Sequence, residues 1–420
     1  MELKKIHISD IGKVVTGKTP RTSIVENYGG DIPFLTPSDD LSYKSVPKTG
    51  KTLTEQGLNE VKNCLLPPHS VCVSCIGTDL GKVVMTSEPT ITNQQFNSII
   101  PNRRFDADFV YYLMTLVGKE LNYLSKTSTA VPIINKSSFS NYEVEVPDLE
   151  TQEKIASILS SLDSKIELNR RINDNLEAMA KQLYDYWFVQ FDFPDENGKP
   201  YKSSGGKMVW DKRLKREIPL LWKAKIVEEV ADVYNGATPS TVNELNYGGD
   251  IVWITPKDLS DQKQKFVYQG ERNISQVGYD SCSTHLLPSN TILMSSRAPI
   301  GLLAIAKTEL CTNQGFKSFV SKSKNIATYL YYYLQYHITQ IEQLGTGTTF
   351  KEVSREDILK FPMLKPSDNV LDLWEEIVSA LNDRQLEIQK ENENLTKQRD
   401  ELLPLLMNGQ VSVNYDLADD

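Results

Sequence analysis

Residues 151–190 read TQEKIASILSSLDSKIELNRRINDNLEAMAKQLYDYWFVQ, a stretch without proline or glycine. Its apolar residues recur along two tracks with a spacing of seven. The tracks consist of Ile155, Leu162, Asn169, Leu176 and Leu183, and of Leu159, Ile166, Asn173, Ala180 and Trp187. Two such tracks are the buried seam of a coiled coil, and about 40 residues at 1.5 Å each make a helix of roughly 60 Å. A seam of that length predicts a partner helix.

The partner pattern lies in the same chain, 219 residues later, and an Asn-Gly pair at 408–409 then predicts a helix end. Its tracks consist of Trp374, Leu381, Ile388, Leu395 and Leu402, and of Val378, Gln385, Asn392, Arg399 and Leu406. We expect the two helices to pair antiparallel. Buried asparagines within such a seam fix its register at some cost in stability. The predicted pairing residues are Leu162, Asn169, Asn173, Leu176, Leu381, Ile388, Asn392 and Leu395.

The same offset repeats outside the helices, so the chain is an internal duplication. The matching segments are Asn27-Tyr-Gly-Gly-Asp-Ile32 with Asn246–Ile251, Leu35-Thr-Pro37 with Ile254–Pro256, Thr92-Asn-Gln94 with Thr312–Gln314, and Tyr111-Tyr-Leu113 with Tyr332–Leu334. Short β-branched runs predict strands at 70–73, 82–85, 290–294 and 302–305, and aromatic-rich runs predict helices at 107–124 and 326–344. The fold class expected is therefore two copies of a mixed α/β (α+β) domain, joined by two long antiparallel coiled-coil helices around an internal pseudo-two-fold axis.

The pattern also predicts where the parts of the chain begin and end. The expected parts are a first domain at 1–148, a first long helix at 149–190, a linker at 191–220, a second domain at 221–366, a second long helix at 367–409 and a tail at 410–420. The linker is rich in Lys, Gly and Ser, which is typical of an exposed connection open to proteolysis.

Charge is distributed unevenly along the 420 residues, whose net charge is −9. Residues 149–198 carry 5 basic and 10 acidic groups, and residues 367–420 carry 4 and 13, whereas residues 199–366 carry 22 and 16, a net of +6. Local field rather than total charge steers a polyanion, so a nucleic-acid partner is compatible with the composition. Five cysteines without regular spacing suit a reducing cytoplasm, and the sequence holds no apolar run long enough for a membrane span.

At this point the residues carry a family resemblance. The run IELNRRINDNLEAMAKQLYDYWFVQFD at 166–192, the twin TP…YGGDI…TP segments and the ending LLPLLMNGQVSV resemble the specificity subunit of Type I restriction–modification systems. The resemblance implies two target-recognition domains that each read half of a split double-stranded DNA site. It also implies two conserved helices that hold two methyltransferase subunits, with restriction subunits as further partners. It implies no catalytic centre and no cofactor of its own, because S-adenosylmethionine, ATP and Mg²⁺ belong to the partners, in a bacterial or archaeal cytoplasm.

Candidate DNA contacts lie in loops that both halves place alike, and within these loops basic residues that differ between the halves are favoured over the shared asparagines. Readout requires Arg or Lys at guanine or phosphate and Asn or Gln at adenine. The basic candidates are Lys44, Lys82, Lys257, Arg297 and Lys317, and the carboxamide candidates are Gln94, Gln95 and Gln314. The shared Asn93 and Asn313 are better explained as residues that hold the loops.

Other interpretations stay open at the level of sequence. Gly12–Thr19 matches a P-loop pattern but is followed by Pro20 rather than by a helix, and Cys72 with Cys75 forms only one of the two pairs typical of zinc sites. A coiled-coil scaffold with two protein-binding domains is the main alternative, and a P-loop NTPase is a third. Steep salt dependence of binding to duplex DNA separates the first two.

Overall fold

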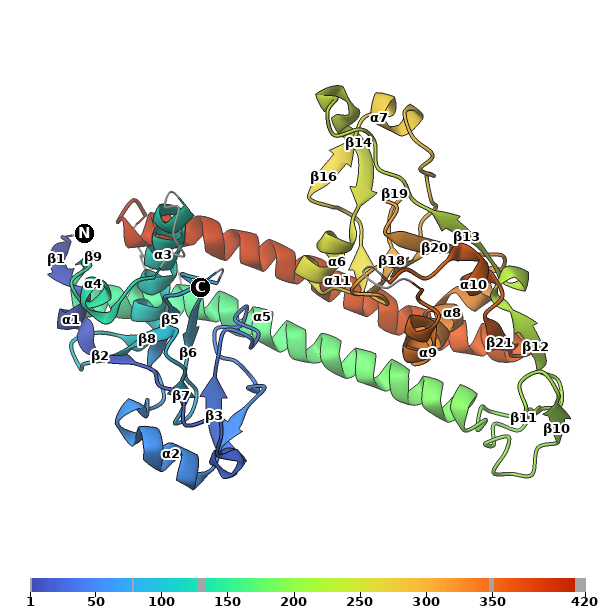
Figure 1. Ribbon diagram of the computed structural model, residues 1–420, viewed down its shortest axis with the longest axis horizontal. Coiled ribbons are helices and arrows are strands. Elements are labelled where there is room, and N and C mark those ends of the chain that lie inside the picture. Colours follow the sequence, from blue (N-terminus) through green and yellow to red (C-terminus); the bar gives the residue numbers. More distant parts are fainter. Residues whose placement is uncertain (1, 78, 127–132, 347–350, 412–420) are drawn as a thin grey trace, which may run out of the picture. The chain divides into compact units, whose positions relative to one another are not determined.

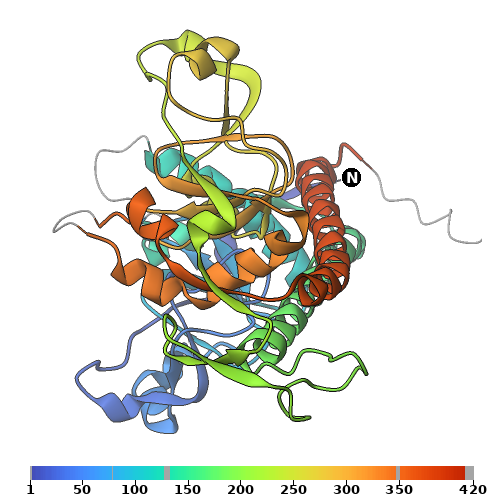
Figure 2. The ribbon, with the colours of Figure 1, turned by 90° about the vertical axis from the view of Figure 1, so that its right-hand side faces the viewer.

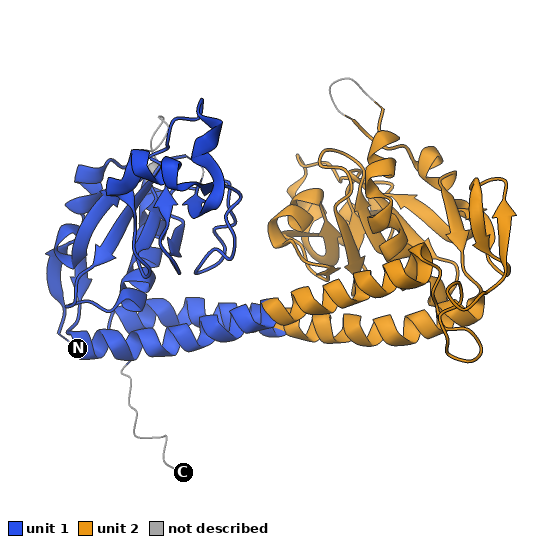
Figure 3. Ribbon diagram, turned by 90° about the horizontal axis from the view of Figure 1, so that it is seen from below, with its two compact units in different colours: residues 1–170, 391–420 blue, residues 171–390 orange. Residues whose placement is uncertain are grey.

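The structure is a computed structural model that describes residues 2–77, 79–126, 133–346 and 351–411. It divides into unit 1, residues 1–170 and 391–420, and unit 2, residues 171–390 (Figure 3). Residues 412–420 of the predicted tail lie outside the described residues.

Unit 1 combines a four-stranded, a three-stranded and a two-stranded sheet with helices packed beside them (Figure 1). Its elements are β1 (Lys4–His7), α1 (Ile8–Ile11), β2 (Gly12–Thr16), β3 (Tyr28–Leu35), β4 (Thr52–Leu53), α2 (Glu55–Val61), β5 (Val71–Ser74), β6 (Val83–Met85), β7 (Ile91–Thr92), β8 (Phe96–Pro101), α3 (Ala107–Lys126), α4 (Lys136–Ser140), β9 (Glu143–Val146) and the first part of α5 (Leu149–Tyr184). The last part of α11 (Asp368–Met407) also belongs to this unit.

Unit 2 repeats this order. Its elements are β10 (Met208–Asp211), β11 (Arg216–Pro219), β12 (Lys223–Ile226), β13 (Ala231–Asn235), β14 (Tyr247–Ile254), α6 (Pro256–Gln262), β15 (Phe266–Val267), β16 (Arg272–Ile274), α7 (Gln276–Asp280), β17 (Ile292–Ser295), β18 (Leu303–Ala306), β19 (Cys311–Thr312), β20 (Phe316–Ser321), α8 (Ala327–Tyr336), α9 (Ile338–Gln343), α10 (Arg355–Leu359), β21 (Pro362–Lys365) and the remaining parts of α5 and α11. The four predicted strands are confirmed within two residues. The predicted helix 326–344 is interrupted at His337, between α8 and α9.

The sheets of the two units share one strand order, to which unit 2 adds β15 beside β18, and this confirms the duplication. The order β2-β8-β5-β6 in unit 1 corresponds to β13-β20-β17-β18 in unit 2, and β4-β3-β7 corresponds to β16-β14-β19. The register shifts between Tyr28 and Ile32 and again between Tyr247 and Ile251. Gly29 and Gly248 lie there with φ of 89° and 80°, a conformation that favours glycine. The repeated Tyr-Gly-Gly motif is therefore the sequence of a β-bulge.

The long helices α5 and α11 pair antiparallel in each unit, as the seam predicted; Figure 2 shows them side by side. In unit 1 Asp163 contacts Arg399, and in unit 2 Trp187 packs against Trp374 with ring centroids 6.1 Å apart. Every track position of both helices is buried or half-buried. The seam is therefore continuous along each helix.

In each unit one asparagine of the seam donates a hydrogen bond from its side chain to a backbone carbonyl of the other long helix. In unit 2 the Asn173 side chain donates to the carbonyl of Gln385 at 3.5 Å, and in unit 1 Asn392, 219 residues later, donates to the carbonyl of Ile166 at 3.4 Å. Asn169 adds a 2.9 Å hydrogen bond to Asn392. The structure thus places these polar groups on the helix contact. Their role in setting the register stays a prediction.

Residues 191–220, expected to be an exposed connection, are exposed at more than half of their positions, and both ends of the segment pack on the core of unit 2. Phe193 stacks on Trp222 with ring centroids 4.9 Å apart, and Phe191 and Ile218 are buried. Strands β10 and β11 then form a two-stranded ribbon above this base. The aromatic and aliphatic residues between the polar runs therefore anchor this connection, which the polar composition alone does not indicate.

Two further expectations concern buried groups. Cys72 and Cys75 are buried in and beside β5, as strand packing predicted, and burial raises the pKa of the Cys72 thiol to about 12. Among the described residues no cluster of metal-ligating side chains is found, and no described helix combines the length and apolarity that crossing a bilayer requires.

Candidate nucleic-acid interface

A tight loop at one end of the main sheet of unit 1 presents Gln94. The loop joins β7 to β8, and its Asn93 accepts a hydrogen bond from the backbone N–H of Gln95 at 3.1 Å while donating to the Gln95 side chain at 2.9 Å. Asn93 is buried, as expected of a residue that holds the loop. Gln94 is exposed, and its carbonyl oxygen accepts a 2.6 Å hydrogen bond from the Thr19 hydroxyl.

Unit 2 builds the same loop with a different third residue. Asn313 accepts from the backbone of Gly315 at 2.9 Å, and the exposed Gln314 accepts from the hydroxyl of Thr238. A carboxamide held in this way keeps its orientation, which is what bidentate contact with adenine requires. Each unit therefore carries one braced, exposed glutamine at an equivalent position.

The segment that matches the P-loop pattern explains how the hydrogen bond between Thr19 and Gln94 forms. Gly12–Thr16 is strand β2, and no helix follows it, so the context of a phosphate-binding loop is missing. A Cβ on Gly17 would lie 2.1 Å from the Asn93 carbonyl oxygen, and one on Gly236 would lie 2.1 Å from that of Asn313. Glycine is needed because the two loops touch there. The shared Gly-x-Thr thus places Thr19 and Thr238 beside their glutamines.

Beside this loop, unit 2 has a charged cluster. Glu352 binds Arg297 at 2.9 Å and Lys317 at 3.2 Å, and Lys317 is buried. Burial alone would raise the pKa of Glu352, but the hydrogen bonds from the two cations outweigh it and lower that pKa. Arg297 stays about half exposed. The structure therefore brings Arg297, Lys317 and Gln314 together at one end of the sheet.

The matching place in unit 1 is uncharged. Asn97 occupies the β8 position that Lys317 occupies in β20, between Thr16 of β2 and Val73 of β5. Its side chain donates to the carbonyl of Ile134 at 3.1 Å. Ile76 bridges Ile133 where Arg297 bridges Glu352. The two units thus share a frame and differ in the side chains that it carries.

The remaining basic candidates lie elsewhere. Lys82 is exposed at the end of the β5–β6 hairpin. Lys257 lies in the first turn of α6 and is paired with Glu271 at 2.7 Å. Lys44 points to the long helices instead, with its ammonium 2.6 Å from Asp108 and 3.1 Å from the Ser160 hydroxyl of α5. Lys44 is therefore placed where it joins the domain to a helix.

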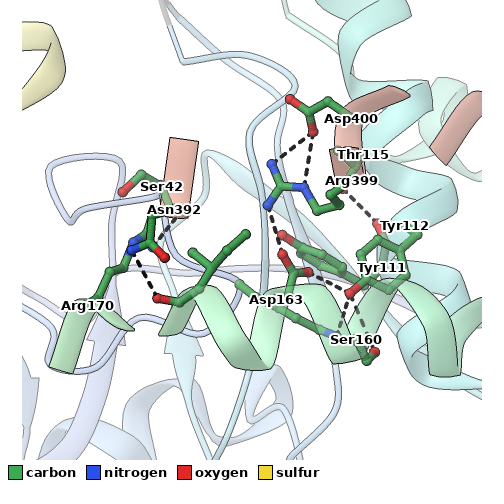
Figure 4. A network of polar contacts seen from close by, with 12 residues as sticks. Ser42, Tyr111, Tyr112, Thr115, Ser160, Asp163, Arg170, Asn392, Arg399 and Asp400 are labelled. Carbon is green, nitrogen blue, oxygen red and sulfur yellow. Dashed lines mark hydrogen bonds and ion pairs between the residues drawn. The ribbon is translucent and has the colours of Figure 1, made fainter. Parts of the chain in front are cut away.

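Lys44 contacts a polar network that sequence reasoning missed, and Figure 4 shows Tyr112, Asp163 and Arg399 of this network. Its ammonium lies 4.7 Å from the ring centroid of Tyr112, whose hydroxyl donates to Asp163 at 2.5 Å. Asp163 in turn binds Arg399 of α11 at 2.8 Å. Burial first, and then the charge of Asp163, raise the pKa of Tyr112, so this phenol stays a donor. We call this set the lysine node of unit 1.

Unit 2 has a matching lysine node around Lys265. Its ammonium lies 4.7 Å from the ring centroid of Tyr332 and contacts Glu177 of α5 at 2.8 Å and Asn382 of α11 at 2.7 Å. Tyr112 and Tyr332 are therefore equivalent in the two nodes, whereas the sequence match aligned Tyr111 with Tyr332. The run of three tyrosines at 331–333 hid that shift. Both acids lie on α5, which follows the first domain in the chain and precedes the second.

A profile of the Type I restriction modification DNA specificity domain matches residues 1–178 and 219–397, one copy in each half of the duplication, and the chain belongs to this family.

Individual relatives cover nearly the whole chain. The chain is similar to the Type I restriction enzyme MjaIX specificity subunit of Methanocaldococcus jannaschii, with 27% identity over 98% of this chain and 94% of the relative. It is 26% identical to the HindI specificity subunit of Haemophilus influenzae, over 80% of this chain and 83% of that one. Its fold resembles the crystal structure of a Type I restriction–modification S subunit from M. genitalium, with a TM-score of 0.56, 15% identity and coverage of 97% and 96%.

Proposed function

We propose that this chain is the non-catalytic DNA-recognition subunit of a Type I restriction–modification complex and reads a bipartite, asymmetric double-stranded site. Residues 1–148 and 221–366 act as the two target-recognition domains. The observation that carries the proposal is the braced glutamine loop, which occurs once in each unit on the same frame with different neighbours. Equal frames with unequal side chains suit two half-sites of different sequence.

In this proposal the residues divide the work by position. Gln94 and Gln314 contact base edges, Arg297 reaches base or phosphate from its cluster, and Lys82 contacts phosphate. Phosphate contacts place the protein on the duplex, whereas contacts in the groove specify sequence. Lys317 acts through Glu352 and Arg297, because it is itself buried. Lys44 joins the first domain to the helices and does not contact DNA.

The long helices serve as the holding element for two methyltransferase subunits, and restriction subunits join through them. The acidic composition of residues 149–198 and 367–420 supports a protein rather than DNA as the partner of these helices, since the like charge of DNA repels them. Methyl transfer, with S-adenosylmethionine, and any ATP-dependent step take place in the partner subunits.

The experiment that tests this function is a map of DNA methylation in the host with and without the gene. The proposal expects one split motif to lose its methylation when the gene is deleted and to regain it on complementation. A scaffold with two protein-binding domains would leave every DNA motif methylated as before. Binding of the purified complex to duplex DNA, with a steep decline as salt rises, is the matching measurement in vitro.

A further inference from the structure

The excess positive charge of the second half is concentrated in one short segment. Residues 199–225 carry nine Lys and Arg against two Asp and Glu, a net of +7, whereas residues 226–366 carry 13 against 14, a net of −1. We call residues 199–225 the basic ribbon, because β10 and β11 form its centre. The reading domain of unit 2 is therefore nearly neutral, and the basic field of this half comes from the ribbon.

The basic ribbon is anchored at its base. Tyr201 stacks on Phe193 with ring centroids 4.7 Å apart, and Phe193 stacks on the buried Trp222. In the strands Val209 faces Ile218, which is buried, while Trp210 pairs with Glu217 on the other face and is 64% exposed. The ribbon is thus packed against the core of unit 2 at its base, and its charged turn at residues 212–215 is exposed to solvent.

The cations of the basic ribbon have few acidic neighbours. Among the ion pairs of the described residues, only that between Lys225 and Glu229 takes up a charge from this segment. Arg213 donates to the carbonyl of Ala224, and Arg216 lies over the Phe191 ring at 4.7 Å. The exposed lysines of the segment are Lys199, Lys202, Lys207, Lys212, Lys215 and Lys223. Such a concentration of uncompensated positive charge attracts a polyanion.

We propose that the basic ribbon is a sequence-independent contact for the phosphate backbone of duplex DNA, separate from the two half-site readers. This inference rests on the proposed function. The segment contains no Asn or Gln, and its two arginines contact Ala224 and Phe191, so its tip lacks a carboxamide for adenine and an unengaged guanidinium fork for guanine. Lysine contacts phosphate as a point charge, without reading sequence.

The position of the ribbon in unit 2 agrees with a separate role. It lies beside the end of α5, on the side of unit 2 opposite to β14, β16 and α7 (Figures 1 and 2). A two-stranded ribbon with basic residues at its turn also has the width that a DNA groove admits. Its contact would raise the local concentration of DNA and speed the search for the target, leaving the choice of target to the readers.

The test neutralises three lysines of the ribbon in the full chain, within the complex purified from its host. Lys207→Gln/Lys212→Gln/Lys215→Gln is compared with Lys119→Gln/Lys324→Gln/Lys360→Gln, which removes the same charge at exposed positions elsewhere. Affinity is measured for a duplex of about 40 base pairs without a target site, between 50 and 200 mM salt. With a slope of about 0.9 per phosphate contact, the wild type should lose roughly 40-fold more affinity over this range than the ribbon variant.

The proposal expects the control variant to keep the wild-type slope and the ribbon variant to methylate the same motif as the wild type. A ribbon variant with the wild-type slope would overturn the proposal. So would an unchanged slope combined with loss of subunits from the complex, which would make the ribbon a protein-binding surface. A wild-type complex without salt-dependent DNA binding would contradict the proposed function itself, so the two failures are distinguishable.

Discussion

Replacing Lys265 by methionine tests how the second domain is held on the long helices. The three N–H groups of its ammonium face four acceptors, at 2.8 Å from Glu177, 2.6 Å from Tyr332, 2.7 Å from Asn382 and 3.1 Å from Gln385. The side chain is 11% exposed. Lys265→Met therefore removes the group that joins α5, α11 and the domain at one point.

The expected cost follows from what the substitution leaves behind. Breaking a buried ion pair from one side costs about 3–5 kcal/mol, because the other charge stays buried. Glu177 is 21% exposed and keeps a second cation, Lys181, at 3.6 Å, and burial of the Lys265 ammonium itself opposes the stabilisation. We therefore expect a value near the lower end, about 3 kcal/mol. Removing both charges in Lys265→Met/Glu177→Met should cost less than Lys265→Met alone.

Urea unfolding followed by tryptophan fluorescence measures this loss in unit 2 specifically. The five tryptophans of the chain all belong to that unit: Trp187, Trp210, Trp222, Trp253 and Trp374. The matched variant Lys44→Met changes the lysine node of unit 1 and should shift the tryptophan transition by less than about 0.5 kcal/mol. A loss below about 1 kcal/mol for Lys265→Met, or a double variant as unstable as the sum of its single variants, would refute the node as a coupled unit.

The same residue predicts a pH dependence. Burial lowers the pKa of Lys265 to about 8, although Glu177 opposes the shift. The unfolded chain therefore binds this proton more strongly, and the penalty is fully present below pH 8 and disappears as pH rises to about 10.5. Relative to Lys265→Met, the wild type should gain up to about 3 kcal/mol over that range. A constant difference in unfolding free energy between the two proteins would contradict the buried ammonium.

Two further substitutions test the sites of the individual units. Gln94→Ala should reduce discrimination at one base pair of one half-site by about 1–3 kcal/mol, and Gln314→Ala should do so only in the other half-site, as measured by binding to duplexes with single substitutions; equal effects in both halves would count against separate readers. Asp163→Asn leaves Arg399 with a weaker partner and should destabilise unit 1 by about 2 kcal/mol. This loss should be measured as faster amide hydrogen exchange in α3, with no change in the tryptophan transition. Unchanged exchange would show that the lysine node does not stabilise unit 1.

The repeated features were predictable from sequence because their physical signals are local. The heptad tracks identified both long helices and their pairing, since a single apolar stripe of that length has to be covered. The Tyr-Gly-Gly repeat marked a turn in both halves, and the structure explains it as a bulge with positive φ at Gly29 and Gly248. Duplication strengthened each of these signals.

The features that were missed depend on side chains far apart in the chain. Asp163 and Asn382 lie off the heptad tracks, and their burial follows from the domain that packs on the helix. The sequence signal for the nodes was that a lysine, at 44 and 265, and a tyrosine pair further along the chain both occur in each half. The basic ribbon was missed because its charge was averaged over the whole second half. Its own aromatic anchors, such as Phe193 and Trp222, were the available sign of a folded segment.

The central claim is that each half of the chain reads one half of a split site. The most direct measurement replaces residues 12–146 by the corresponding segment of a family member with a different methylation motif, and then maps methylation in a host that carries the exchanged chain. The account predicts that one half of the motif changes to that of the donor while the other half is kept. A motif that changes in both halves, or in neither, would contradict it.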